Sequence, residues 1–319
     1  MNVPEALIEF IKSGTEFIVA GHKEPDGDCV GSQLAITSLL RRLGKKAFPC
    51  SAGPFKRIEV KPYEDRFLPC PAAAKGMRVL VMDCTNRERV GDLPIDGMPV
   101  ASVDHHATQN PWGEAVFLDP EAPSVTFLTE KIFRALDMEI LPEEAELLFL
   151  GLCTDTGFFR HLDGGEYCQA VLETAARLCG AGASPKKTFA AIYGGKSLNS
   201  RLLMGAMLAK THSYYNGRLL ISNETLEETK RYGLESRDSD MTYQLLQSIK
   251  GVEAMVLIRQ ETQEECTIGF RSRDHVDVAA IAKDFGGGGH KNAAGTKIRG
   301  TIPEMEERIA AAFASCFNI

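Results

Sequence analysis

The sequence lacks several features that would place it among membrane, secreted or duplex-binding proteins. No run of about 18 apolar residues occurs, so no membrane-spanning helix is expected. The nine cysteines contain no CxxC pair, and such an odd, unpatterned set is typical of reduced thiols in the cytoplasm. The first 14 residues carry acids and predict a helix rather than a signal peptide. Basic residues are not in excess either: the net charge is −7, which disfavours long duplex nucleic acid as a partner.

What is present is an ordinary globular composition over 319 residues, 44% of them hydrophobic, which predicts about two domains. In the first part, apolar runs that predict strands alternate with amphipathic stretches that predict helices. The expected strands are 16–22, 77–83 and 99–104, and the expected helices are 29–44, 122–138, 142–157 and 166–182. This alternation predicts an α/β domain over residues 1–190, with a parallel sheet and helices on both faces.

The rest of the chain predicts a second, smaller domain. Residues 191–214, with a helix near 197–211, are expected to be a helical linker. Beyond them we expect a smaller α/β domain with a mixed sheet over residues 215–319. Its strands are expected at 217–223, 253–260 and 265–272, and its helices near 240–250, 276–285 and 303–316. The Pro-rich connection 52–71 is expected to be either a lid or a plain excursion.

Acids and histidines follow each apolar run of the first domain. The first expected strand precedes His22, Asp26 and Asp28, and Asp83 ends the second. Asp104, His105 and His106 end the third, and Asp155 ends the apolar part of 142–157. A single acid at a strand end is often only a cap or turn former. Because parallel strands bring their carboxyl ends to one edge, where ligands bind, the four groups are expected to converge.

A cluster of four carboxylates needs compensating positive charge. Asp26, Asp28, Asp83 and Asp155 would repel one another, and two divalent cations would balance their four charges. With two imidazoles added, the ligand set suits Mn, Fe, Co or Zn better than Ca. Pairs of ions roughly 3.5–4 Å apart are a recurring solution for hydrolysing phosphate esters. Asp83, on a central strand, is the expected bridge between the ions.

Five motifs in order resemble those of one known family. "GHKEPDGDCVGS", "VMDCT", "SVDHHATQ" and "CTDTGFFR" resemble the four motifs of the DHH phosphoesterases, and "GGGGHKNAAG" (286–295) resembles the DHHA1 motif. Within that family the chain is most similar to bacterial oligoribonucleases that also act as phosphatases on adenosine 3′,5′-bisphosphate. The resemblance implies hydrolysis of short oligoribonucleotides or nucleotide bisphosphates by a water that two metal ions, preferably Mn²⁺, activate.

The resemblance also implies roles for individual residues. His22, Asp26 and Asp83 would hold one ion, and Asp28, Asp83, His105 and Asp155 the other. His106 would face the scissile phosphate as an acid near the leaving oxygen, or only donate a hydrogen bond there. Asp104 would orient an imidazole. Arg160, five residues after Asp155, is expected either to reach the scissile phosphate or to form a surface salt bridge.

In the second domain the glycine run predicts a phosphate-binding cradle, the alternative being a helix end followed by a loop. The expected substrate-binding residues are Arg271, Ser272, Gly287, Gly288, Gly289 and His290. The DHHA1 resemblance implies that they hold the terminal phosphate of the nucleotide.

Other functions are compatible with the same motifs. The closest alternative is a phosphodiesterase for cyclic di-AMP or linear dinucleotides. A pyrophosphatase or polyphosphatase is less favoured because of the GGGGH motif, and an inactive nucleotide sensor because every expected ligand is present. A homodimer is compatible with the sequence.

Overall fold

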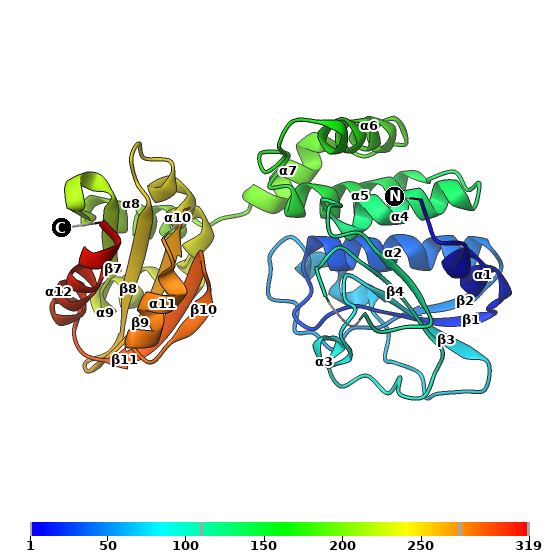
Figure 1. Ribbon diagram of the computed structural model, residues 1–319, viewed down its shortest axis with the longest axis horizontal. Coiled ribbons are helices and arrows are strands. Elements are labelled where there is room, and N and C mark those ends of the chain that lie inside the picture. The colour runs from blue at the N-terminus through cyan, green and yellow to red at the C-terminus, as the bar shows by residue number, and fades with distance from the viewer. Residues whose placement is uncertain (1, 109–110, 274–275, 318–319) are drawn as a thin grey trace. The chain divides into compact units, whose positions relative to one another are not determined.

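The computed structural model in Figure 1 describes residues 2–108, 111–273 and 276–317. Gln109, the last residue of the third motif, lies outside these residues. The chain forms two compact units, Met1–Gly195 and Lys196–Ile319. The helix expected in the linker is α8 (Leu198–Ala209), which belongs to the second unit. Its Leu203 and Met207 are buried in one cluster with Leu220 and Leu257. The helix therefore packs in the core of the second unit and is not simply a connection.

The first unit is built on a five-stranded sheet in which all pairs are parallel. The strands are β1 (Glu16–Ala20), β2 (Lys46–Pro49), β3 (Met77–Met82), β4 (Val100–Asp104) and β5 (Ala115–Leu118), in the order β2-β1-β3-β4-β5. The expected α/β class is confirmed. The three central strands are the predicted ones, whereas the sequence did not reveal the edge strands β2 and β5, which have only four residues each.

Helices cover the two faces of this sheet unequally. One face packs on α1 (Glu5–Ser13), α2 (Gly27–Arg42) and α4 (Val125–Ala135), with α5 (Pro142–Asp155) stacked on α2 and α4 (Figure 1). The other face is covered by the short α3 (Arg87–Val90) and by connections whose buried residues include Leu93 and Ile95. The helices α6 (Glu166–Gly180) and α7 (Pro185–Tyr193) complete the unit. Full burial of a Leu or Phe side chain contributes roughly 1.5–3 kcal/mol, so these two apolar layers stabilise the frame that carries the site.

The long connection 52–71 is a packed excursion. Phe55 and Val60 are buried, and the rings of Phe55 and Phe67 lie 5.0 Å apart. A 3-10 turn, Lys61–Arg66, lies within it. Glu24 donates its backbone N–H to the carbonyl of Gly53, which joins this connection to the loop after β1.

The second unit has a mixed six-stranded sheet, as predicted. Its strands are β6 (His212–Tyr214), β7 (Leu219–Glu224), β8 (Ala254–Thr262), β9 (Glu265–Ser272), β10 (Gly288–His290) and β11 (Ala293–Arg299), in the order β10-β11-β9-β8-β7-β6. Only β7 and β8 pair in parallel. The helices are α8, α9 (Leu226–Tyr232), α10 (Ser239–Gln247), α11 (Val278–Asp284) and α12 (Ile302–Ala312). Buried residues form one apolar layer on each side of the sheet.

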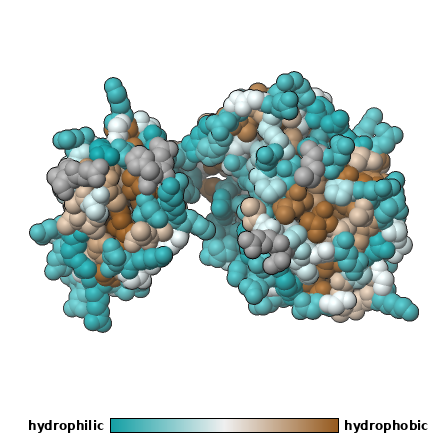
Figure 2. Space-filling model, in the orientation of Figure 1, coloured by the Kyte–Doolittle hydropathy of each residue, from teal (hydrophilic) through white to brown (hydrophobic). Residues whose placement is uncertain are grey.

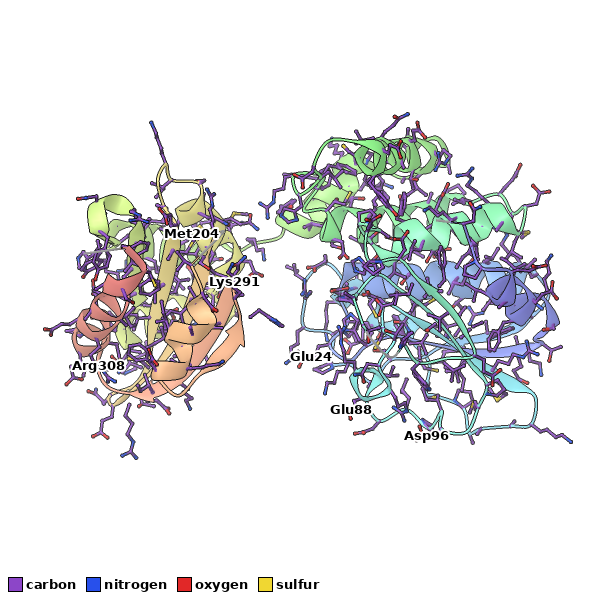
Figure 3. The ribbon with its side chains drawn as sticks, viewed as in Figure 1. Glu24, Glu88, Asp96, Met204, Lys291 and Arg308 are labelled. Atoms are coloured by element: carbon purple, nitrogen blue, oxygen red, sulfur yellow. The ribbon has the colours of Figure 1, made fainter. Side chains whose placement is uncertain are left out.

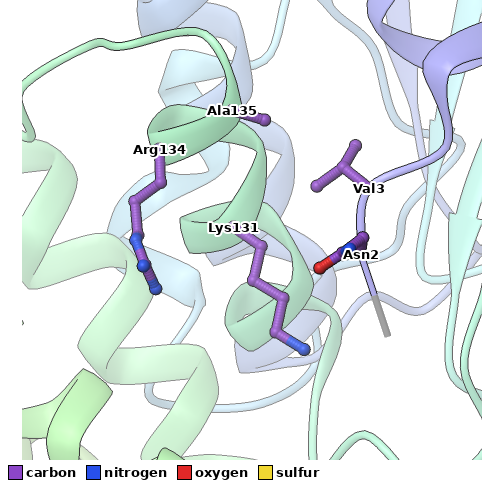
Figure 4. Close-up of a pocket in the computed structure, with 5 residues that line it drawn as sticks. All are labelled: Asn2, Val3, Lys131, Arg134 and Ala135. Atoms are coloured by element: carbon purple, nitrogen blue, oxygen red, sulfur yellow. The ribbon is translucent and has the colours of Figure 1, made fainter.

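The face of the molecule seen in Figure 2 is mainly hydrophilic, with smaller apolar patches. Among the described residues, no helix is both long and apolar enough to cross a membrane. A pocket near the N-terminus is lined by Asn2, Val3, Lys131, Arg134 and Ala135 (Figure 4). It contains none of the residues that the sequence predicted to be functional.

Candidate metal centre

The predicted ligands converge at the carboxyl ends of three adjacent strands. In the order β2-β1-β3-β4-β5 the strand sequence changes direction between β1 and β3, and ligands bind in the crevice at such a switch point. His22 lies two residues after β1, Asp83 directly follows β3, and Asp104 is the last residue of β4. Figure 3 places Glu24, on the loop after β1, and Glu88, on α3, at the same end of the first unit.

Asp83 is the central residue of this cluster. Its backbone adopts φ 59°, a left-handed conformation that Asp tolerates better than most residues. The side chain is buried, and its two oxygens point to different imidazoles. Oδ2 lies 3.3 Å from Nε2 of His22, and Oδ1 lies 3.8 Å from Nε2 of His105. Oδ1 is buried and accepts no hydrogen bond from any residue that the structure describes, which is costly for a carboxylate unless a cation is bound.

On one side of Asp83 lie His22 and Asp26. Nδ1 of His22 donates to the carbonyl of Lys23 at 2.8 Å, which leaves the lone pair of Nε2 available. This Nε2 lies 3.7 Å from Oδ1 of Asp26, which also caps α2 by accepting the N–H of Cys29. The Cys29 thiol is close by, but burial raises its pKa to about 12 and its Sγ donates to Gln33. It is therefore a neutral packing thiol.

On the other side lie Asp28, His105 and Asp155, whose potential ligand atoms are all within 4.8 Å of one another. Nδ1 of His105 donates to the carbonyl of Ala122 at 3.0 Å, and its Nε2 lies 3.3 Å from Oδ2 of Asp155. Asp28 is fully buried at the start of α2. It accepts the N–H groups of Val125 and Thr126, at 2.5 and 2.8 Å, and so is fixed at the N-terminus of α4. Each group is thus held by protein contacts while ligand lone pairs remain.

The electrostatics of the cluster fit divalent cations. Burial raises the pKa of Asp28, Asp83 and Asp155 above the ordinary carboxyl range, and neighbouring acids raise each of them further. Without compensation these buried groups would hold protons, and cations would replace those protons. The orphaned Asp83 oxygen, together with a donor set of carboxylates and imidazoles, suits a mixed N/O metal site.

Asp104 accepts more hydrogen bonds from protein donors than Asp28, whose two oxygens each accept one backbone N–H. Oδ1 accepts the N–H groups of His105 and His106 and also Nδ1 of His106, at 2.7, 3.0 and 2.8 Å. Oδ2 accepts the hydroxyl of Thr85. These bonds hold the His106 ring, whose side chain is 46% exposed, and the bond to Asp104 raises the pKa of His106. Asp104 therefore braces the histidine loop, and His106 presents its free ring edge outward.

Arg160 is exposed, five residues after Asp155, and its contact with the scissile phosphate stays a prediction. Its Nε donates to Nε2 of His161 at 3.0 Å, and among the described residues it forms no ion pair. Two other arginines, which the sequence did not single out, lie near the centre. Burial raises the pKa of Asp26. His22, with a smaller contribution from the charge of Arg57, outweighs burial and holds that pKa below its usual range. The backbone of Arg89 accepts the N–H of Lys23, and its charge acts on His106. No sequence pattern marked them, since only folding brings residues 57 and 89 to this loop.

In the second unit, Arg271 and His290 project from one row of the sheet. Arg271 pairs with Ala293, and Ala293 pairs with His290, so the three residues share a face. The Arg271 guanidinium lies 4.8 Å from the ring centre of Tyr243. Ser272, by contrast, is buried and donates its hydroxyl to the carbonyl of Val276 at 2.7 Å. Its hydroxyl is therefore committed to a protein acceptor.

The glycines of the run have different structural roles. A Cβ on Gly287 would lie 2.3 Å from the carbonyl oxygen of Gly295, and one on Gly289 would lie 2.5 Å from that of Ala293. Both glycines therefore permit the close approach of β10 to β11. A Cβ on Gly288 would meet no atom within 4 Å, and its φ is not left-handed. The fold alone explains Gly287 and Gly289 but not Gly288.

Comparisons with known proteins agree with this layout. Residues 16–152 match the "DHH family, N-terminal domain" and residues 222–318 match the "DHHA1 domain". The bifunctional oligoribonuclease and PAP phosphatase of Thermus thermophilus is 30% identical over 304 residues, which cover 91% of this chain and 87% of that protein. Its counterpart of the same name in Bacillus subtilis is 26% identical, with 92% of each chain covered. A crystal structure of an exopolyphosphatase-related protein from Bacteroides fragilis superposes with a TM-score of 0.82 at 20% identity, covering 99% of this chain and 97% of that one.

Proposed function

Given that this chain belongs to the DHH family and is a metal-dependent phosphoesterase, we propose that it hydrolyses short oligoribonucleotides and adenosine 3′,5′-bisphosphate. The observation that carries the proposal is the buried Asp83 carboxylate, whose two oxygens point to two separate sets of ligand-type side chains. The names of the two relatives support the choice of substrates.

We assign the metal ligands by these two sets. His22, Asp26 and Asp83 would hold one divalent ion, and Asp28, Asp83, His105 and Asp155 would hold a second. We expect the ions to be Mn²⁺. When bound, they would stabilise the phosphoryl group as Lewis acids and lower the pKa of a water, so that it can lose a proton and attack the phosphorus. His22 and His105 each donate the N–H of Nδ1 to a backbone carbonyl. Their Nε2 atoms therefore carry a lone pair that can coordinate an ion.

The other residues singled out in the two units would move a proton or bind phosphate. His106, held by Asp104, would donate the proton on its Nε2 to the leaving oxygen. Arg271 and His290 would bind a phosphate of the nucleotide, because guanidinium groups form charge-assisted hydrogen bonds with phosphate oxygens. The open space at Gly288 would let that phosphate approach the backbone. Ser272, whose hydroxyl donates to the carbonyl of Val276, would act by holding the end of β9 in place.

A substrate panel with Mn²⁺ tests the proposal. We expect short RNAs of a few nucleotides and adenosine 3′,5′-bisphosphate to be turned over faster than a long RNA. The panel also contains cyclic di-AMP, the substrate of the alternative that the sequence motifs left open, and pyrophosphate. Preference for cyclic di-AMP would establish that alternative, and activity confined to pyrophosphate would overturn both.

The Gly288→Ala variant tests the phosphate cradle separately. Because the new Cβ meets no protein atom, we expect an unchanged melting temperature. If a phosphate approaches the backbone here, kcat/KM for nucleotide substrates should fall by about ten- to a hundredfold, the loss of one or two charge-assisted contacts. The matched control is Gly205→Ala on α8, where a Cβ also meets nothing. Equal kcat/KM for Gly288→Ala and wild type would remove Gly288 from the binding site.

A further inference from the structure

The segment that follows Asp155 has an unusual backbone. Gly157, Phe158 and Phe159 all have positive φ, at 57°, 58° and 71°. For bulky residues such as Phe this conformation costs about 1–3 kcal/mol each, and it persists only where the surroundings impose it. Here Phe158 donates its N–H to the carbonyl of Cys153 at 2.7 Å, and Phe159 donates to the hydroxyl of Thr156. The two phenyl rings are thus fixed immediately after a predicted metal ligand.

From this segment a chain of aromatic rings leads to the surface. Phe158 and Phe159 pack against the core of the first unit. The Phe158 ring lies 5.4 Å from that of Phe189 on α7, and Phe189 lies 4.8 Å from Tyr193. The ring planes of Phe158 and Tyr193 are inclined to that of Phe189 by 83° and 46°, so neither ring stacks parallel on a face of Phe189. Phe189 is 53% exposed, although most rings of this size are buried.

A second connection joins this surface to the metal centre. The backbone of Gly195, just after α7, lies close to the Ile58 side chain, since a Cβ built on Gly195 would be 3.5 Å from it. Ile58 is itself 43% exposed. Ile58 follows Arg57, whose charge acts on both Asp26 and Asp155. The exposed side chains of Phe189 and Ile58 and the half-buried Tyr193, here called the Phe189 patch, are therefore linked to the carboxylates through residues 155–159 and through residues 57–58.

We propose that the Phe189 patch is a stacking site for a nucleobase of the substrate, with Phe189 and Tyr193 supplying the rings. The inference rests on the proposed function, because the base would belong to a nucleotide whose phosphate is at the metal centre. Aromatic rings connected through Phe158 to the segment that follows Asp155 suit nucleobases of any sequence, since every base has a π-face. Stacking of this kind is worth about 1–3 kcal/mol per base, which corresponds to roughly 5- to 150-fold in binding.

The test compares a short RNA with the same RNA lacking one base. The variant is Phe189→Leu, which keeps an apolar side chain of similar size but removes the ring. We expect wild type to prefer the intact RNA, and the variant to lose about tenfold in kcat/KM on it with no change on the abasic RNA. A dinucleotide containing 2-aminopurine gives a second readout, because stacking on a ring quenches its fluorescence. Leu172→Ala on α6, at a position 49% exposed, is the matched control.

The outcomes separate this inference from the proposed function. If wild type does not hydrolyse short RNA, the proposed function fails first. If it does, but Phe189→Leu slows intact and abasic RNA equally, the stacking site is wrong and the function stands. A change in the oligomeric state of Phe189→Leu, with the ratio of intact to abasic rates unaltered, would instead identify the patch as an interface between copies of this chain.

Discussion

Replacing Asp83 with Asn is expected to abolish hydrolysis and to leave fewer than two metal ions per chain. Asn keeps the size of the side chain and tolerates the left-handed φ of 59°, so the backbone of the loop should be unchanged. It removes the negative charge and the second anionic oxygen that a bridge between two ions requires. The rate should fall by more than the roughly 10²- to 10³-fold typical of one lost electrostatic contact. Rates with Mn²⁺ and metal content after dialysis are the measurements.

Thermal denaturation tests the metal centre without an activity measurement, first in the unsubstituted chain. In the metal-free chain Asp28, Asp83 and Asp155 have raised pKa values, chiefly through burial. The folded state therefore binds their protons more tightly than the unfolded state, so these groups destabilise the chain as pH rises above the ordinary carboxyl range. Bound cations replace those protons, and the increase in melting temperature on adding Mn²⁺ should be larger at pH about 7.5 than at about 5.5.

Asp83→Asn should change this behaviour in a defined direction. It removes one buried charge, so the metal-free variant should be at least as stable as metal-free wild type near neutral pH. It should also gain little stability from Mn²⁺. A variant that still binds two ions and hydrolyses RNA at the wild-type rate would refute the bridging role of Asp83.

The His106→Ala variant should lose activity in proportion to how much the leaving group needs a proton. On RNA, whose leaving oxygen is a poor leaving group, we expect a loss of about 10²- to 10⁴-fold, the usual contribution of a general acid. On bis-p-nitrophenyl phosphate, whose leaving group departs as a stable anion, the loss should be much smaller. His161→Ala is the matched control, because His161 is an exposed histidine of the same unit that contacts Arg160. Equal losses on both substrates would show that His106 does not act as an acid.

The brace of His106 by Asp104 predicts a pH effect as well. The hydrogen bond that Nδ1 of His106 donates to the Asp104 carboxylate raises the pKa of His106 above its ordinary value, so the protonated, proton-donating form persists to higher pH. Asp104→Asn removes the negative charge of this acceptor and should lower that pKa. The alkaline limb of the pH–rate profile should then move to lower pH, while the same substitution at a surface acid such as Asp96 should leave it in place.

Much of the first unit could be predicted from the sequence because its signals are local. The central strands β1, β3 and β4 are nearly continuous apolar runs, and the buried faces on both sides of the sheet require that pattern. The meeting of His22, Asp83 and His105 follows from topology alone, since parallel strands share their carboxyl edge. The edge strands β2 and β5 were not predicted, because each has four residues with only two of them buried.

The α/β class, the family resemblance and the gathering of these residues at one edge of the sheet could thus be predicted from the sequence alone. Which of them keep free ligand atoms depends on long-range contacts that form only on folding. Asp83 and Asp104 look alike at their strand ends, yet Asp83 has an orphaned buried oxygen, whereas both oxygens of Asp104 accept hydrogen bonds. Likewise Gly288 differs from Gly287 and Gly289 only through strand pairing. Arg57 acts on Asp26, and Phe189 contacts Phe158, through long-range packing that no local pattern encodes.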